Sequence, residues 1–472
     1  MNLLSNKLQG RDTISLVSLF GTDGIRGTVG KDLSVNLVYQ IGFCAGQILQ
    51  LNSLKSGPII VGQDSRNSSE MLTKALTLGL SNAGLEVWNL GLCPSATVSF
   101  LTQNTAAIGG VMISASHNPP EDNGIKFFDQ DGCKLSEAVQ AAIATAIYQA
   151  PLPGQICDRK LGKRYDRSEL IADYHTLLCQ FICSETSSEK PLQGLRVVLD
   201  LAWGAAVDLA PQVFHQLGAE VFSLHALADG DRINVNCGST HLVPLQTAVQ
   251  EIGADLGFAF DGDADRVLAV DAQGQTVDGD HILYLWGHQL QQQQRLPQNL
   301  LVATVMSNLA FEQAWQQQGG KLIRTAVGDH NVCKGLRESG GVLGGEQSGH
   351  ILCRHYGNTG DGIATALHLA KLVQQTGRSL ATLLEDSFQA YPQILCNVRV
   401  VDRDRRIHWK NCEELQKVIL RAETALGTCG RILVRSSGTE PVLRIMVEAA
   451  TASLASFWSQ EITIAAEHYL AA

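Results

Sequence analysis

Hydrophobic and polar positions recur in one order at three places: a short apolar run, an amphipathic segment and a second apolar run. These stretches lie at residues 57–91, 195–224 and 299–325. An order of strand, helix and strand predicts parallel pairing of the two strands through a right-handed crossover. In the first stretch, Ser68 or Ser69 is placed to begin the helix and Gly84 to close it. The repetition indicates three related α/β domains, although independent instances of a common motif would give the same pattern.

The pattern changes near the C-terminus. Apolar runs at 397–401, 430–435 and 442–449 enclose a helix-like segment at 410–426, which predicts a small α+β domain with antiparallel strands. The expected fold is therefore α/β, with mixed, mainly parallel sheets in three domains and an α+β domain after them. Polar stretches at 150–168 and 288–299 serve as expected connectors. The predicted division is an extension at 1–17, α/β domains at 18–185, 186–295 and 296–392, and the α+β domain at 393–472.

Composition narrows the classes of function. A chain of 472 residues is long enough for several domains, and its net charge of −10 argues against a nucleic-acid-binding surface. No apolar run is long enough for a membrane span, and the first residues lack the apolar centre of a signal peptide. The twelve cysteines are scattered without a CxxC pair or a zinc-like cluster, as in a cytoplasmic protein with reduced thiols. No coiled coil or repeat specifies an oligomeric state.

The stretch 110–128, GVMISASHNPPEDNGIKFF, holds a candidate nucleophile. Its first apolar run ends in a loop with Ser114, Ser116 and His117, and Lys126 lies just beyond. Ligands of open α/β sheets bind at such carboxyl ends of strands. A hydroxyl beside a basic group is typical of an activated nucleophile, although an ordinary strand-to-turn transition would look the same. Ser116 is favoured over Ser114 because it lies farther into the loop, beside His117.

A second stretch, DLGFAFDGDADRVLAVDAQG at 255–274, carries Asp261, Asp263 and Asp265 between two apolar runs. On an extended chain these alternate carboxylates would project to one side and bind a hard divalent cation, for which Mg²⁺ fits best. The segment is not an EF-hand, because Arg266 and Ala272 stand where that loop requires Gly and Glu. The alternative is an acidic β-turn without a metal.

Two further glycine-rich stretches are candidate binding loops. In GGVLGGEQSGHILCRH at 340–355, a carboxylate and a hydroxyl could bind sugar hydroxyls, unless the segment is a structural turn. In RILVRSSGTEPVLRIMVEA at 431–449, hydroxyls, backbone N–H groups and arginines could hold a phosphate, unless it is a plain hairpin; it lacks the Walker spacing. The residues concerned are Glu346, Gln347, Ser348 and His350 in the first stretch and Arg435, Ser436, Ser437, Gly438, Thr439 and Arg444 in the second. Another loop, FGTDGIRG at 20–27, places Arg26 near the start of the chain.

SASHNP, DGDADR, GGEQSGH and RSSGTEP, in this order, resemble the α-D-phosphohexomutase superfamily from residue 18 to 472. FGTDGIRG and Gln347 favour the branch that acts on glucosamine phosphates over the glucose and mannose phosphate branch. The resemblance implies four domains around one central cleft. It also marks a departure, since His330 and Asn331 follow Val327-Gly328-Asp329 where the family usually has Arg-Tyr.

The resemblance also implies roles for individual residues. Ser116 corresponds to the phosphorylated serine, with His117 and Arg26 beside it, and Lys126 to a residue that assists proton transfer. One Mg²⁺ per chain would be held by the phosphoserine with Asp261, Asp263 and Asp265, while Arg266 would help to offset the charge of the transferring group. Glu346 and Ser348 match residues that bind sugar hydroxyls. The loop Arg435–Thr439, followed by Arg444, matches the loop that holds the substrate's phosphate.

The implied reaction interconverts glucosamine 6-phosphate and glucosamine 1-phosphate through a 1,6-bisphosphate, a trace of which would prime Ser116. Such an isomerase would supply amino sugar precursors for the cell wall, and its partners would be small sugar phosphates, not nucleic acid or membrane. Three alternatives stay open: a glucose or mannose phosphate mutase, a Mg²⁺-dependent phosphatase, and a non-catalytic sugar-phosphate sensor.

Overall fold

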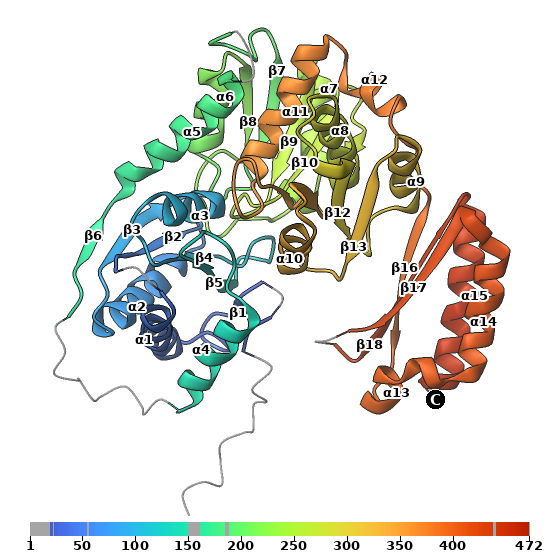
Figure 1. Cartoon of the computed structure of the whole chain (residues 1–472), viewed down its shortest axis with the longest axis horizontal. Coiled ribbons are helices and arrows are strands. Elements are labelled where there is room, and N and C mark those ends of the chain that lie inside the picture. The colour runs from blue at the N-terminus through green and yellow to red at the C-terminus, as the bar shows by residue number, and fades with distance from the viewer. Residues whose placement is uncertain are drawn as a thin grey trace, which may run out of the picture.

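The computed structural model describes residues 19–21, 23–53, 56–149, 161–184, 188–437 and 440–471. Over these ranges the chain forms four sheets, each built from its own part of the sequence and covered by helices (Figure 1). No helix in the described ranges is both long and apolar enough to cross a membrane. The predicted extension at 1–17 lies outside the described residues, as do Gly438 and Thr439.

The first sheet has the strand order β1-β5-β4-β2-β3-β6. As the first strand–helix–strand pattern predicted, β2 and β3 are parallel. Ser68 is the residue before α2 and Gly84 follows it with φ 94°, so both helix limits agree with the sequence. The elements are β1 (Ile25–Thr28), β2 (Ile59–Gln63), β3 (Val87–Leu92), β4 (Gly109–Ile113), β5 (Asp122–Asp129), β6 (Arg164–Asp166), α1 (Val35–Asn52), α2 (Ser69–Asn82), α3 (Ser95–Asn104) and α4 (Glu137–Gln149).

The expected connector at 150–168 is partly wrong. Its residues 164–166 form β6, an edge strand that pairs in parallel with β3. All three residues of β6 are exposed. An exposed edge strand buries no face, so it leaves no alternation of apolar and polar residues from which it could be predicted.

The second and third sheets have the orders β11-β10-β9-β7-β8 and β13-β12-β14-β15. The pairs β7–β8 and β12–β13 are parallel, as the sequence predicted. The second sheet and its helices are β7 (Arg196–Asp200), β8 (Glu220–Leu224), β9 (Leu256–Phe260), β10 (Val267–Asp271), β11 (Thr276–Val277), α5 (Ile171–Ser184), α6 (Leu209–Gln216) and α7 (Val243–Ile252). The third group is β12 (Leu300–Thr304), β13 (Lys321–Thr325), β14 (Leu343–Gly345), β15 (Ile351–Cys353), α8 (Gly279–Gln292), α9 (Leu309–Gln317), α10 (Asp329–Ser339), α11 (Gly362–Thr376) and α12 (Leu380–Glu385). The expected connector at 288–299 is partly wrong, because residues 288–292 form the end of α8.

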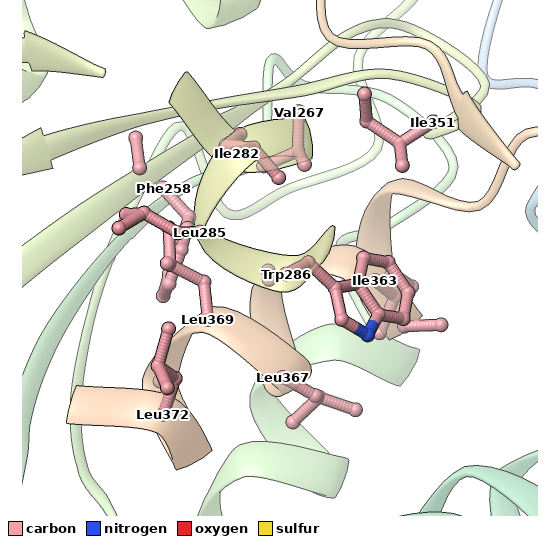
Figure 2. Packing of buried hydrophobic residues seen from close by; sticks show 14 of the residues in the cluster. Phe258, Val267, Ile282, Leu285, Trp286, Ile351, Ile363, Leu367, Leu369 and Leu372 are labelled. Carbon is pink, nitrogen blue, oxygen red and sulfur yellow. The ribbon is translucent and has the colours of Figure 1, made fainter. Parts of the chain in front are cut away.

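One hydrophobic core joins the second and third sheets. Figure 2 shows Trp286 of α8 and Leu367 of α11 packed in the same cluster as Phe258 of β9. Each buried side chain of this size contributes about 1.5–3 kcal/mol. The shared core therefore makes these two sheets a common base for the loops at their ends.

The C-terminal part is a three-stranded antiparallel sheet with β18 between β16 and β17, as predicted. Helices α14 and α15 lie on the side of this sheet away from the rest of the molecule (Figure 1). Buried Glu448 links the sheet to the third group, because it accepts a hydrogen bond of 3.2 Å from the backbone N–H of Leu309. Arg431 at 2.6 Å and Gln393 at 2.7 Å donate to the same carboxylate from within the sheet. The elements are β16 (Gln393–Arg399), β17 (Gly430–Ser436), β18 (Val442–Ala449), α13 (Arg403–Ile407), α14 (Glu413–Leu426) and α15 (Ala452–Leu470).

Candidate active site

Ser116 lies in the loop between β4 and β5 and is fully buried. Its hydroxyl donates a hydrogen bond to Oδ2 of Asp261 at 2.6 Å and lies 3.2 Å from Nδ1 of His117. The Ser114 hydroxyl instead accepts a hydrogen bond from the backbone N–H of Ser116 at 2.9 Å. Of the two hydroxyls, the one of Ser116 therefore faces the acidic loop, and Ser114 supports the turn.

The Ser116 loop is held by two side chains that the sequence analysis missed. Buried Arg66 donates to the carbonyl oxygens of Ser116 at 2.9 Å and Asn118 at 2.7 Å. Asn234, from the second group of elements, donates to the same two carbonyls at 2.9 and 3.1 Å. These contacts stabilise Ser116 at φ 56°, which is rare for residues other than glycine. The polar run after β2 that contains Arg66 was the available signal, since β2 ends at the same sheet edge as β4.

The three aspartates lie in the turn between the antiparallel strands β9 and β10. Asp261, Asp263 and Asp265 are at most 2% exposed, and one oxygen of each lies within 4.8 Å of the others. The expectation of an extended chain is wrong, because the segment is a succession of turns in which Ala264 has φ 58°. The turns, and not strand alternation, bring the carboxylates together.

Two observations show that this cluster fits a divalent cation. Oδ1 of Asp263 and Oδ1 of Asp265 are buried and have no hydrogen-bond partner among the described residues, a costly state for carboxylate oxygens. Burial, followed by the charges of Asp265 and Asp263, raises the pKa of Asp261 to about 8. A set of oxygen ligands with this mutual repulsion is suited to a hard cation such as Mg²⁺ or Ca²⁺.

Lys126 and His117 differ in charge. Lys126 donates to Asp263 at 2.6 Å and Asp265 at 2.7 Å, and lies 3.3 Å from Asp23. Burial lowers the pKa of Lys126, but the three carboxylates outweigh burial and raise it overall, so the amine stays protonated. Burial, then the charges of Arg266 and Arg26, lowers the pKa of His117 to about 4. At neutral pH His117 is therefore the group that can accept a proton.

A chain of charged side chains extends from this site to α10. Asp23 pairs with Arg26 and Lys134, and Lys134 pairs in turn with Asp329 at the start of α10. Nε2 of His350 lies 3.5 Å from Asp329 and 3.9 Å from Asp265. Sequence reasoning included Arg26 but missed Asp23 and Lys134. Their local sequence gives no sign of a partner so distant in the chain.

The glycine-rich loop between β14 and β15 adjoins the aspartate cluster, because it carries His350 and because the carbonyl of Gly349 accepts a hydrogen bond of 3.1 Å from the backbone N–H of Val267. Between β14 and β15, Oε1 of Glu346 accepts a hydrogen bond from the backbone N–H of Gly328 at 3.0 Å, and Ser348 is exposed. Gln347 donates to Asp278 at 3.1 Å. At the departure from the family pattern, Asn331 donates to the carbonyl of Val327 at 3.0 Å and so stabilises the first turn of α10.

The loop between β17 and β18 begins with two arginines in opposite positions. Arg435 and Arg444 are direct neighbours on adjacent strands, an arrangement in which like charges repel. Burial, followed by the charge of Arg444, lowers the pKa of Arg435. Both residues line a cavity of about 290 Å³ that Met306 borders from the third group. Ser436 ends β17 and Ser437 follows it. Arg444 also donates to Glu440 at 2.6 Å, which offsets part of its charge. An anion bound here would relieve the remaining repulsion.

Asp200, His225 and Cys237 form a second close group of possible metal ligands. Asp200 already accepts hydrogen bonds from the backbone N–H groups of Ala202 at 3.0 Å and Gly238 at 2.9 Å, and its Oδ1 lies 2.8 Å from Nδ1 of His225. Donors on both carboxylate oxygens indicate a structural role for this group.

Four family models match successive parts of the chain. They are described as phosphoglucomutase/phosphomannomutase alpha/beta/alpha domain I at residues 17–152, domain II at 172–274, domain III at 278–391 and C-terminal domain at 395–464. The chain belongs to the phosphoglucomutase/phosphomannomutase family. As a phosphohexomutase, it is an isomerase.

Several curated members of this family are similar over nearly the whole chain. The phosphoglucosamine mutase of Trichormus variabilis is 60% identical over 99% of this chain and 96% of its own length. That of Synechocystis is 57% identical over 96% of this chain and 93% of its own length.

Solved phosphohexomutase structures share the fold. A phosphoglucomutase/phosphomannomutase family protein from Burkholderia thailandensis aligns with a TM-score of 0.80 and 24% identity, covering 97% of this chain and 98% of its own. The N-acetylphosphoglucosamine mutase of Aspergillus fumigatus, solved with GlcNAc-6P and magnesium, aligns with a TM-score of 0.65 and 18% identity, covering 96% of both chains.

Proposed function

We propose that this phosphohexomutase interconverts glucosamine 6-phosphate and glucosamine 1-phosphate through phosphorylated Ser116. The observation that carries the proposal is the hydrogen bond of 2.6 Å between the buried Ser116 hydroxyl and the aspartate cluster. The choice of the amino sugar is supported by phosphoglucosamine mutases that are 57–60% identical over at least 96% of this chain.

Asp261, Asp263 and Asp265 are proposed to hold one Mg²⁺, together with an oxygen of phosphorylated Ser116. The unpartnered buried oxygens of Asp263 and Asp265 and the closeness of the three carboxylates support this assignment. When bound, the ion offsets negative charge on the transferring phosphoryl group, which is the main source of catalysis in phosphoryl transfer.

The side chains around Ser116 would provide proton transfer and charge stabilisation. His117 is neutral at neutral pH, so it would take the proton of the attacking sugar hydroxyl. Protonated Lys126 and the guanidinium of Arg266 would bind phosphoryl oxygens and offset their charge, with Arg26 beside the phosphoserine. The Ser116 phosphoryl group passes to O1 of the bound 6-phosphate, which gives the 1,6-bisphosphate. After the sugar turns over, the 6-phosphoryl group returns to Ser116 and glucosamine 1-phosphate is released.

Turning the sugar over requires a second site for the phosphate that does not react. Arg435 and Arg444 are proposed to form it with the loop Ser436, Ser437, Gly438 and Thr439, because an anion would offset their cross-strand repulsion. Glu346 and Ser348 would bind sugar hydroxyls. A trace of sugar 1,6-bisphosphate would phosphorylate Ser116 for the first cycle.

The test is a mutase assay with glucosamine 6-phosphate and glucose 6-phosphate side by side, with Mg²⁺ and a trace of the matching 1,6-bisphosphate. The proposal expects a strong preference in kcat/KM for the amino sugar and little release of inorganic phosphate. Equal or reversed preference would assign the enzyme to hexose phosphates and leave the phosphoserine mechanism in place. Stoichiometric phosphate release would indicate a phosphatase, and absence of turnover on both sugars would indicate a sensor.

A further inference from the structure

A serine from the first group of elements contacts one of the three clustered aspartates. Ser95 is the first residue of α3 and is 1% exposed. Its hydroxyl donates a hydrogen bond to Oδ2 of Asp263, and its backbone N–H donates to the carbonyl oxygen of Asp263 at 3.0 Å. The side chain and the backbone of one residue therefore bind the same aspartate in the turn between β9 and β10.

The two carboxylate oxygens of Asp263 have different surroundings. Oδ2 accepts a second hydrogen bond, of 2.6 Å, from Nζ of Lys126. Oδ1 is buried and has no hydrogen-bond partner among the described residues. Rotating the carboxylate would break both hydrogen bonds to Oδ2. Oδ1 is therefore kept in one direction, as the oxygen that can bind a cation.

The two donors to Oδ2 differ in their effect on a bound cation. Protonated Lys126 also donates to Asp265 at 2.7 Å, so its charge opposes a second cation at these carboxylates. The Ser95 hydroxyl is neutral. It can orient Asp263 without repelling the cation.

The position of α3 relates Ser95 to the candidate nucleophile. Helix α3 packs against β2 and β4, and the loop after β4 carries Ser116, whose hydroxyl donates to Asp261 at 2.6 Å. The first group of elements therefore contacts the aspartate turn at two points, through Ser116 to Asp261 and through Ser95 to Asp263.

We propose that Ser95 is a positioning residue, which orients Asp263 as a ligand of the divalent cation. Carboxylates that bind metals are themselves held by hydrogen bonds, and losing such a bond typically weakens metal affinity by about 10–100-fold. Without the hydroxyl, Oδ2 keeps only Lys126, and the carboxylate can turn towards that ammonium group. The inference rests on the Mg²⁺ site of the proposed function, but not on which sugar phosphate the enzyme uses.

The test is metal binding by the full chain, with Mn²⁺ as the probe in place of Mg²⁺, because electron paramagnetic resonance measures free Mn²⁺ directly. Ser95→Ala removes the hydroxyl and keeps the backbone hydrogen bond to Asp263. Its dissociation constant for Mn²⁺ should rise by about tenfold or more. Ser95→Thr, which keeps a hydroxyl, should bind Mn²⁺ as the wild type does.

Ser99→Ala is the matched control. Ser99 lies one turn later on α3, is 2% exposed, and donates to the carbonyl of Gly132 at 2.6 Å. Urea unfolding should show a similar loss of stability for both alanine variants, while Ser99→Ala keeps the wild-type affinity for Mn²⁺. In the Asp263→Ala protein, Ser95→Ala should change the remaining affinity no further, because the group that it orients is absent.

The outcomes separate this inference from the proposed function. If the wild type binds Mn²⁺ and Ser95→Ala binds it equally well, the inference is overturned and the metal site stands. An equal loss of affinity in Ser99→Ala or in Ser95→Thr would also overturn it, because the loss would not come from the missing hydroxyl. If the wild type binds no Mn²⁺, or if Asp263→Ala binds it as tightly as the wild type, the proposed metal site fails and the role of Ser95 fails with it.

Discussion

Replacing Lys134 by Met removes the cation between the Ser116 region and α10. Lys134 pairs with both Asp23 and Asp329, and the three side chains are 12%, 14% and 9% exposed. Asp23 retains Arg26 and Lys126 as partners. Asp329 retains, among the described residues, a contact of 3.5 Å with His350 and a hydrogen bond of 2.7 Å from the backbone N–H of His330.

The expected loss of stability comes mainly from Asp329, which keeps weaker partners than Asp23 when Lys134 is removed. Removing one partner of a fully buried ion pair costs about 3–5 kcal/mol, because the other charge stays buried alone. Asp329 is slightly exposed and retains two weaker contacts, so we expect a loss of about 2 kcal/mol in the free energy of unfolding. In the Asp329→Asn protein no carboxylate is left without its cation, so the same Lys134→Met change should lower the free energy of unfolding much less. The cycle should give a coupling energy of about 2 kcal/mol.

The assay is urea unfolding of the wild type, both single variants and the double variant, followed by fluorescence and circular dichroism. Lys74→Met is the matched control, since Lys74 pairs with Glu70 on the surface of α2, where both side chains are over 70% exposed; its unfolding midpoint should not move. A coupling energy below about 0.5 kcal/mol, the value of a surface pair, would refute the claim that this ion pair stabilises the contact with α10.

Four further outcomes are expected. Ser116→Ala should keep the fold and lose nearly all mutase activity, so a variant with a tenth of the wild-type rate would contradict the assignment. Asp263→Ala should abolish the response of activity to Mg²⁺ in a titration, and an unaffected enzyme would remove the metal assignment. Arg66→Lys keeps the charge but loses the hydrogen-bonding fork to the Ser116 loop, so kcat should fall with little change in KM, and an unchanged kcat would show that the loop does not need it. Burial, then the charge of Asp278, raises the pKa of Asp280 to about 7. The unfolded chain then deprotonates first, and stability should fall as pH rises from roughly 4 to about 7; Asp280→Asn should flatten that fall in urea midpoints, and the same slope in both proteins would contradict it.

Local pattern in the sequence predicted the repeating units of the fold and the polar loops of the candidate active site. A buried strand followed by an amphipathic helix gives a periodic pattern of apolar and polar residues. The pairs β2–β3, β7–β8 and β12–β13 could therefore be predicted as parallel. The polar loops after β4 and β9 were found for the same reason, since each interrupts an apolar run abruptly. Where no face of a strand is buried, as in β6, this pattern is absent from the sequence.

Tertiary structure alone decided which side chains meet. Arg66 binds the Ser116 carbonyl across 50 residues of chain, Asn234 across 118, and Lys134 reaches Asp329 across 195. The turn at Ala264, and not strand alternation, brings the aspartates together. Such contacts depend on how separate sheets pack, and a charged or polar residue whose partner is distant in sequence leaves no periodic signal beside it. The sequence therefore determined the periodic elements and the residue types of the candidate site, and packing determined the hydrogen bonds that hold the Ser116 loop and the ion pair with α10.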